Sequence, residues 1–201
     1  MPNTQRATEI PTIDVEMLVI ETSGDSTVSY ALDSASNIGV EPQIETQDAV
    51  KLIVKGRLKA QKGEVSTITG NKITIKDNVF IPELVKILQG GTIKYWQDAE
   101  KTQEATTPSE YGISSYTPPV AGSNDKGEVF TLHAYSAQYN AAGQIVQYER
   151  IDYPNCQGVP VALNSEDGVF RAPEYTINSA PNVGEAPYSI HYVPSLPVLS
   201  N

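Results

Sequence analysis

The sequence predicts a mainly β domain, a β-sandwich or barrel-like sheet, with one short helix packed on it and one long loop. Most apolar residues stand in short runs that alternate with polar residues and end at Gly, Pro or Asn, as in half-buried strands. Helical spacing occurs in one segment, at about 82–89. Another segment, at about 97–126, has no sustained periodicity. Because 201 residues suffice for one core and no stretch reads as a linker, we expect 1–201 to form a single domain.

The N-terminal part is predicted to bring one strand into the core. Residues 1–12 are polar and are expected to form an arm. Residues 12–20 alternate at first and then become continuously apolar, as in a strand that enters a core. Residues 21–47 are rich in Ser, Thr and acidic side chains, so we expect a loop with one short strand at 27–32.

Residues 49–64 show the sharpest alternation in the chain and predict one long strand with a basic face. The apolar face holds Leu52, Val54, Leu58 and Ala60. The basic face holds Lys51, Lys55, Arg57 and Lys59. This row is suited to bind DNA phosphates, to pair with carboxylates of a neighbouring subunit, or simply to be solvated. Beyond it, Gly70 and Asn71 stand between two β-patterned runs and predict a hairpin turn.

The helix predicted at 82–89 has clear boundaries. Pro82 suits the first helical position, and Glu83 follows where the helix dipole favours an anion. Gly90 or Gly91 is suited to end the helix with a positive φ. Two turns are too short to be stable alone, so the apolar face must lie on the sheet. That face consists of Ile81, Leu84, Val85 and Leu88.

The C-terminal half is predicted to be a long loop followed by strands. The loop at 97–126 is rich in Pro, Gly, Thr and Ser, and a loop of this length in a compact domain usually has a function. Two β-rich runs, 128–139 and 144–153, predict a long hairpin. Further strands are expected within 159–177 and at 188–193.

The formal net charge at pH 7 is −10, and acidic residues outnumber basic ones in both halves of the chain. This charge argues against conventional DNA binding. Many soluble cytoplasmic proteins are acidic, so the charge alone does not indicate a function. No apolar run is long enough to span a bilayer, and the first residues do not resemble a signal peptide. With one cysteine, Cys156, an intramolecular disulfide is excluded.

Motifs that carry chemistry are missing from the sequence. His133, His191 and Cys156 are isolated, so we expect no metal site, and His133 is expected to form a hydrogen bond in a strand. Neither a Gly-x-Ser-x-Gly motif nor a phosphate-binding glycine loop is present. Asp14 and Glu16 share one face of a strand, which is usually its solvated side. We therefore expect no catalytic residue and no cofactor, and a protein that is not an enzyme.

Two blocks of sequence resemble the major tail tube proteins of long-tailed bacteriophages, especially those of Gram-positive hosts. The first is a strand at 72–78, a helix opened by Phe80, Pro82 and Glu83, and a closing run at 88–93. The second comprises 153–156, 170–176 and 187–190. The resemblance spans about 49–194, with a gap in the variable middle.

This resemblance implies a structural virion protein with the tail tube fold. Six copies would form a ring whose inner sheets join into a continuous β-barrel, and rings would stack into a conduit for the genome. The implied partners are other copies of the chain, the tape measure protein, the tail terminator and the tail tip proteins, whereas viral DNA passes without specific binding and no membrane takes part. The protein would be part of the phage tail, and in the host cytoplasm before assembly.

Two alternatives remain open at this point. One is the inner tube of a contractile tail or injection system, since such proteins share the fold. The other is a monomeric β-sandwich binding module that recognises carbohydrate or protein through residues 97–126. Particle size would separate this second class from a tube subunit.

The resemblance also bears on which residues meet a neighbouring subunit. A conduit that lets DNA slide needs an acidic or neutral lining, so the basic row is better explained as a subunit contact or an exterior face. The chain has 11 Tyr against three Phe, and Tyr is enriched at interfaces, although half-buried strand packing would also explain it. Tyr111 and Tyr116, in the long loop, are therefore further candidates for the subunit interface.

Overall fold

The computed structural model describes residues 11–23 and 28–199 and confirms a mainly β fold with one short helix and several antiparallel sheets. Residues 1–10 of the predicted N-terminal arm lie outside the described residues, and the first strand, β1, begins at Thr12. No helix in the described part of the chain is long and apolar enough to cross a membrane.

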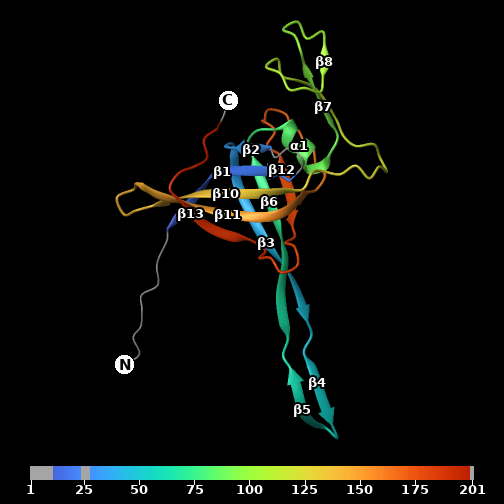
Figure 1. Cartoon of the computed structure of the whole chain (residues 1–201), viewed down its shortest axis with the longest axis vertical. Helices are drawn as coiled ribbons and strands as arrows, with labels where there is room; N and C mark the ends of the chain where they lie inside the picture. The colour runs from blue at the N-terminus through green and yellow to red at the C-terminus, as the bar shows by residue number, and fades with distance from the viewer. Residues whose placement is uncertain (1–10, 24–27, 200–201) are drawn as a thin grey trace.

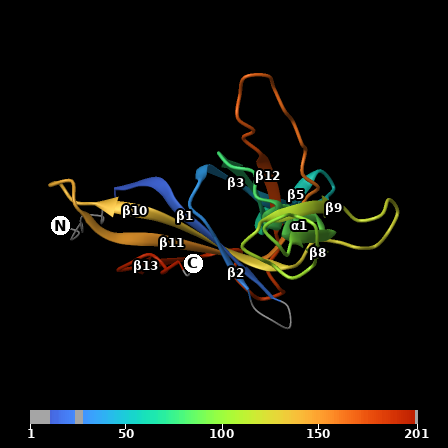
Figure 2. The same cartoon turned by 90° about the horizontal axis from the view of Figure 1, so that it is seen from above.

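The main sheet has eight strands in the order β2-β1-β10-β11-β12-β6-β3, and β13 also pairs with β11. Its strands are β1 (Thr12–Thr22), β2 (Ser29–Leu32), β3 (Ala35–Gln47), β6 (Val65–Asp77), β10 (Phe130–Tyr139), β11 (Ile145–Gly158), β12 (Glu174–Ser179) and β13 (Ser189–Val193). In Figure 1, β1, β10 and β11 run across the view while β3 and β6 run nearly perpendicular to them. The sheet therefore folds over itself, and Figure 2 shows the first group side by side from above.

The main core lies between the two halves of this sheet. Leu18 and Ile20 of β1 point into it together with Leu132 of β10 and Ile73 of β6, all with 0% exposure. Because side chains alternate along a strand, Met17 and Val19 lie on the opposite face of the sheet, where they pack on Tyr135. The predicted strand at 12–20 and the long β10–β11 hairpin are confirmed.

Helix α1 (Pro82–Gln89) packs on the main core with most of the predicted face. Leu84, Val85 and Leu88 are buried, and so is Ile87, which the sequence reading did not include. Ile81 is only partly buried because it is the extended N-cap residue that precedes the helix. The helix ends at Gly90, whose φ of 83° is positive and whose N–H donates to the carbonyl of Lys86.

Two glycines allow other segments to approach the last turn of α1 closely. A Cβ on Gly158 would lie 2.4 Å from the Cα of Leu88, and a Cβ on Gly127 would lie 2.3 Å from the carbonyl oxygen of Leu88. The next residue, Glu128, donates its N–H to the carbonyl of Ile87 at 2.8 Å. Segments far apart in the sequence are thus fixed against the same helical turn.

The hairpin turn predicted at Gly70 and Asn71 is wrong, because β6 runs through both residues without a turn. Gly70 serves a close approach instead, since a Cβ there would lie 2.3 Å from the carbonyl oxygen of Ser179 on β12. Within the predicted loop at 21–47, the short strand expected at 27–32 is confirmed by β2, but the rest of the loop is wrong from Ala35 onwards, where the 13-residue strand β3 lies. Strand β3 lies at an edge and is mostly exposed, so it has no apolar face that a pattern could reveal.

The single long strand predicted at 49–64 is in fact a hairpin of β4 (Val50–Val54) and β5 (Arg57–Lys62). Lys55 and Gly56 form its turn, with φ values of 50° and 73°. Arg57 pairs with Val54, and residues that face each other across two strands point to the same side of the sheet. Lys51 lies three residues before Val54 on the same strand, so its side chain points to the opposite side. Lys51 and Arg57 therefore lie on opposite faces. The row of four basic residues on one face is therefore wrong, although all four belong to the same hairpin.

The segment 97–126 is more ordered than the loop that the sequence predicts. Together with β7 (Thr92–Trp96), the strands β8 (Glu104–Ala105) and β9 (Ile113–Thr117) form a separate three-stranded sheet. Its first turn is held by Asp98, whose carboxylate accepts bonds from the N–H groups of Thr102 and Gln103. Strand β8 has two residues and β9 has five, so neither is long enough to show a clear periodicity. The strand expected near 159–163 is absent, and β12 begins at Glu174.

Candidate assembly arm and acidic pocket

A long two-stranded arm extends from the main sheet. Strand β12 covers β6 only from Asn71 to Lys76, so beyond that point β3 and β6 pair with each other alone and lead into β4 and β5. Figure 1 shows this arm at one end of the long axis of the molecule. We define the arm tip as residues 50–62, which comprise β4, the turn and β5.

All residues of the arm tip are exposed. Five of them are large apolar residues with exposures between 43% and 66%: Val50, Leu52, Ile53, Val54 and Leu58. A two-stranded hairpin without a covered face is marginally stable, and exposed apolar patches usually mark contact sites. The arm tip therefore has the properties of a surface that another molecule covers.

The arm tip is also the most basic part of the chain. It contains five basic residues and no acidic one: Lys51, Lys55, Arg57, Lys59 and Lys62. The whole chain has 14 basic and 24 acidic residues, so outside the arm tip nine basic residues stand against 24 acidic ones. None of the five forms an ion pair with another described residue. The four basic residues selected from the sequence thus lie on an exposed hairpin and form no ion pair with another described residue.

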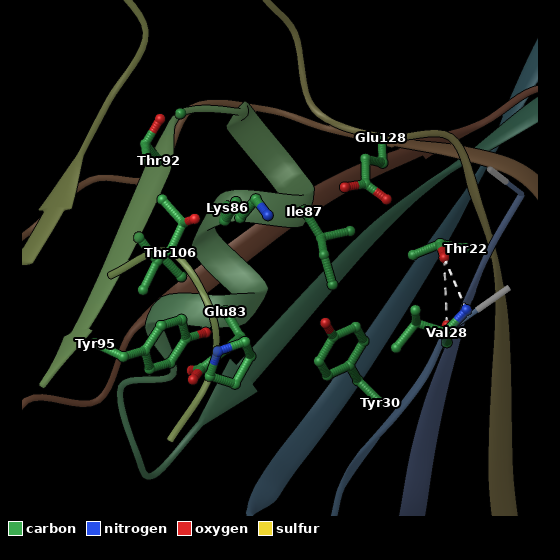
Figure 3. Close-up of a pocket in the computed structure, with 13 residues that line it drawn as sticks. Thr22, Val28, Tyr30, Glu83, Lys86, Ile87, Thr92, Tyr95, Thr106 and Glu128 are labelled. Carbon is green, nitrogen blue, oxygen red and sulfur yellow. Dashed lines mark hydrogen bonds between the residues drawn. The ribbon is translucent and has the colours of Figure 1, made fainter. Parts of the chain in front are cut away.

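A polar cavity lies between α1, β2 and β7, on the side of the main sheet that faces away from the arm (Figure 3). Its volume is about 430 Å³. The charged groups at its wall are Glu83 and Lys86 of α1 and Glu128, and two tyrosines, Tyr30 of β2 and Tyr95 of β7, complete the polar lining. We call it the acidic pocket.

Burial and the nearby carboxylates raise the pKa of both tyrosines in the acidic pocket. Burial, followed by the charges of Glu128 and Glu83, raises the pKa of Tyr30. Burial, followed by the charge of Glu83, raises the pKa of Tyr95. Neither Glu83 nor Glu128 belongs to an ion pair within the described residues. Two carboxylates and the one ammonium group of Lys86 leave the pocket with an excess negative charge.

Helix α1, strand β7 and a backbone hydrogen bond hold the polar side chains of the pocket in place. Glu83 occupies the first turn of α1, where the helix dipole favours a carboxylate. Glu128 is positioned by its own N–H, which donates to Ile87. Tyr95 projects from β7, beside Glu83 in Figure 3. Sequence reasoning missed this site because its residues come from four distant segments and form no motif.

The two tyrosines proposed from the sequence differ in their surroundings. Tyr111 is 39% exposed, so its side chain is accessible. The hydroxyl of Tyr116 is engaged within the subunit, where it donates to the carbonyl of Gly90 and accepts a bond from Gln89, both at 2.8 Å. Tyr116 therefore braces the end of α1 against β9, a role that a subunit contact would have to preserve.

The fold also brings the two histidines to one carboxylate on the sheet face opposite to α1. His133 Nδ1 lies 2.6 Å from Asp152 Oδ1, and Arg150 donates to Asp152 Oδ2 at 2.9 Å. His191 Nε2 lies 3.5 Å from Asp152 Oδ2 and 3.1 Å from Ser189 Oγ. The hydrogen bond of His133 agrees with the expectation from the sequence.

This cluster does not have the geometry of a nucleophile and its base. Both contacts of His191 fall on the same ring nitrogen, Nε2, so the ring cannot accept a proton from Ser189 while Asp152 holds its other nitrogen. Cys156 lies apart, in the main core. Among the described residues, no group of three or more His, Cys, Asp or Glu side chains is arranged to hold a metal ion.

No protein-family model matches the sequence, and no curated protein matches it either. Among solved structures, the chain is similar to the tube-terminating cap of the anti-feeding prophage, with a TM-score of 0.42 and 11% identity over 94% of this chain and 95% of that chain. It is also similar to a chain of the six-fold symmetrised baseplate of the anti-feeding prophage, with a TM-score of 0.30 and 6% identity over 94% and 93%. TM-scores this low do not establish a shared fold, so neither similarity assigns a function.

Proposed function

We propose that this protein is a structural subunit of a phage tail tube and that it assembles with other copies of itself. The observation that carries the proposal is the arm tip, a fully exposed hairpin with five large apolar side chains. Burying one such side chain completely is worth about 1.5–3 kcal/mol. A surface of this kind is stable in water chiefly as one half of an interface.

The charge distribution favours another copy of the chain as the partner. The arm tip is basic and the rest of the chain is strongly acidic, so the tip of one subunit is attracted to the body of the next. A contact between two different surfaces of identical subunits is heterologous, and repetition of such a contact produces a ring or a filament.

The finer features of the proposal come from the resemblance of residues 49–194 to major tail tube proteins. Six subunits form a ring, and rings stack into the tube of a long, non-contractile tail of a phage with a Gram-positive host. Viral DNA crosses this tube without specific binding, and the tape measure, terminator and tip proteins contact its inside and its ends. The protein is incorporated into the virion after synthesis in the host cytoplasm. It needs no catalytic residue for this role.

Assembly of the purified protein tests the proposal directly. We expect the wild type to form tubes with increasing concentration in negative-stain microscopy and sedimentation velocity. The double variant Leu52→Asn, Ile53→Asn should remain monomeric, because it makes the exposed arm tip polar. Its melting temperature should be unchanged, since neither side chain is buried within the subunit.

The matched control is Val120→Asn with Val169→Asn, two apolar residues with 80% and 63% exposure that lie outside the arm. This control should assemble as the wild type does. A wild-type protein that stays monomeric at every concentration would refute self-assembly. Normal tubes from the Leu52, Ile53 variant would show that the arm tip is not the contact.

A further inference from the structure

We propose that the acidic pocket is the receptor for the arm of a neighbouring subunit and that it binds the two basic residues at the arm's turn, Lys55 and Arg57. The inference rests on the proposed function, because it takes a second copy of the chain as the ligand. It adds the surface on which the arm docks and the chemistry that recognises it.

Charge is the first reason for this pairing. The pocket contains Glu83 and Glu128 with Lys86 as the only cation among its lining residues, so its carboxylates outnumber its cations and attract a basic partner. Lys55 and Arg57 flank Gly56 at the end of the arm and have no ion-pair partner among the described residues. Each group therefore lacks an ion-pair partner in the isolated subunit, and the charges of the two sites are opposite.

The shape of the two sites is the second reason. Lys55 and Gly56 form a two-residue turn with positive φ values, which makes the end of the arm narrow. No atom lies within 4 Å of a Cβ placed on Gly56, so the turn is free to enter a recess. The pocket offers about 430 Å³, enough for a guanidinium or ammonium side chain, and its tyrosine rings suit a cation.

Position is the third reason. The arm tip lies at one end of the long axis, whereas α1 and β2, which line the acidic pocket, lie on the side of the main sheet that faces away from the arm (Figure 1). From Gln43 to Lys55, an extended strand at about 3.3 Å per residue reaches up to roughly 40 Å. When subunits stack head to tail, the tip of one therefore points toward the side of the next subunit that carries the pocket, and every pocket except those at one end of the tube is filled.

A charge-swap experiment tests the pairing. One variant reverses the pocket (Glu83→Arg, Glu128→Arg) and a second reverses the turn (Lys55→Glu, Arg57→Glu). Each variant alone should need at least a tenfold higher concentration than the wild type to form tubes. A mixture of the two should assemble at near wild-type concentration, because each variant's tip then meets a pocket of opposite charge.

The control is Glu166→Arg with Asp167→Arg, which changes the net charge as the pocket variant does but lies in an exposed loop. It should assemble normally, and circular dichroism melting should show that all variants fold. Normal assembly by either reversed variant alone would overturn the pairing while leaving self-assembly intact. Failure of the mixture, when each variant folds, would show that these charges do not meet each other. A monomeric wild type would instead refute the proposed function.

Discussion

At the scale of single residues, burial controls the chemistry of the only cysteine. Cys156 is fully buried, and its thiol donates to the carbonyl of Tyr153 at 3.3 Å. Burial raises the pKa of this thiol from its ordinary value of 9.0 to about 12. Burial likewise raises the pKa of the Tyr153 hydroxyl to about 12. The folded state therefore favours the neutral form of both groups.

This linkage predicts a loss of stability in alkaline solution. The unfolded thiol ionises from about pH 9, whereas the folded one stays neutral until about pH 12, so its contribution is complete below pH 9 and is lost as the pH rises towards 12. One such group contributes a slope of up to about 1.4 kcal/mol per pH unit. Urea unfolding between pH 8 and 11 should show a steeper decline for the wild type than for Cys156→Ala. Equal slopes would mean that the thiol is not linked to folding.

At the scale of elements, the sequence predicted those that bury one clear face. Helix α1 was found because its buried residues recur with helical spacing between a proline and a glycine. The β10–β11 hairpin was found because long apolar runs flank a turn. These elements were predicted because their buried apolar residues form the core and also give the sequence its hydrophobic periodicity.

Elements without a buried face were missed for a physical reason. Strand β3 is held by its pairing with β6 and is mostly exposed, so nothing requires an apolar period. The β4–β5 hairpin keeps alternating through its turn, and Gly56 alone marked the reversal. The acidic pocket could not be predicted either, since it depends on how β2, α1, β7 and Glu128 meet in space.

The packing of α1 predicts unequal effects of two substitutions in its second turn. Leu88 is 1% exposed and contacts the β11 backbone near Gly158, so Leu88→Ala should destabilise the protein by about 2–5 kcal/mol. Lys86 is exposed, and Lys86→Ala should change stability by less than about 0.5 kcal/mol. Urea denaturation of the two variants measures the difference. Similar values for both would refute this orientation of the helix.

At the scale of the whole molecule, charge separates the basic arm tip from an acidic body. Assembly that depends on their attraction should weaken in salt, since the screening length falls from about 10 Å at 0.1 M to about 3 Å at 1 M. Between these concentrations of NaCl, the protein concentration needed for tubes should rise by roughly tenfold, or about 1.4 kcal/mol. Light scattering against protein concentration measures it. Assembly that salt leaves unchanged or promotes would contradict an electrostatic contact.

The distribution of charge along the arm has a consequence for the directionality of growth. Lysine and arginine residues stand among the exposed apolar residues of the tip, and they hinder two tips from pairing edge to edge. Acidic bodies repel each other in the same way, so only the approach of a tip to a body is attractive. A polymer built on this rule has a polarity: its two ends differ chemically, one displaying free arms and the other displaying vacant pockets. A single capping protein can then stop growth at one end without affecting the other.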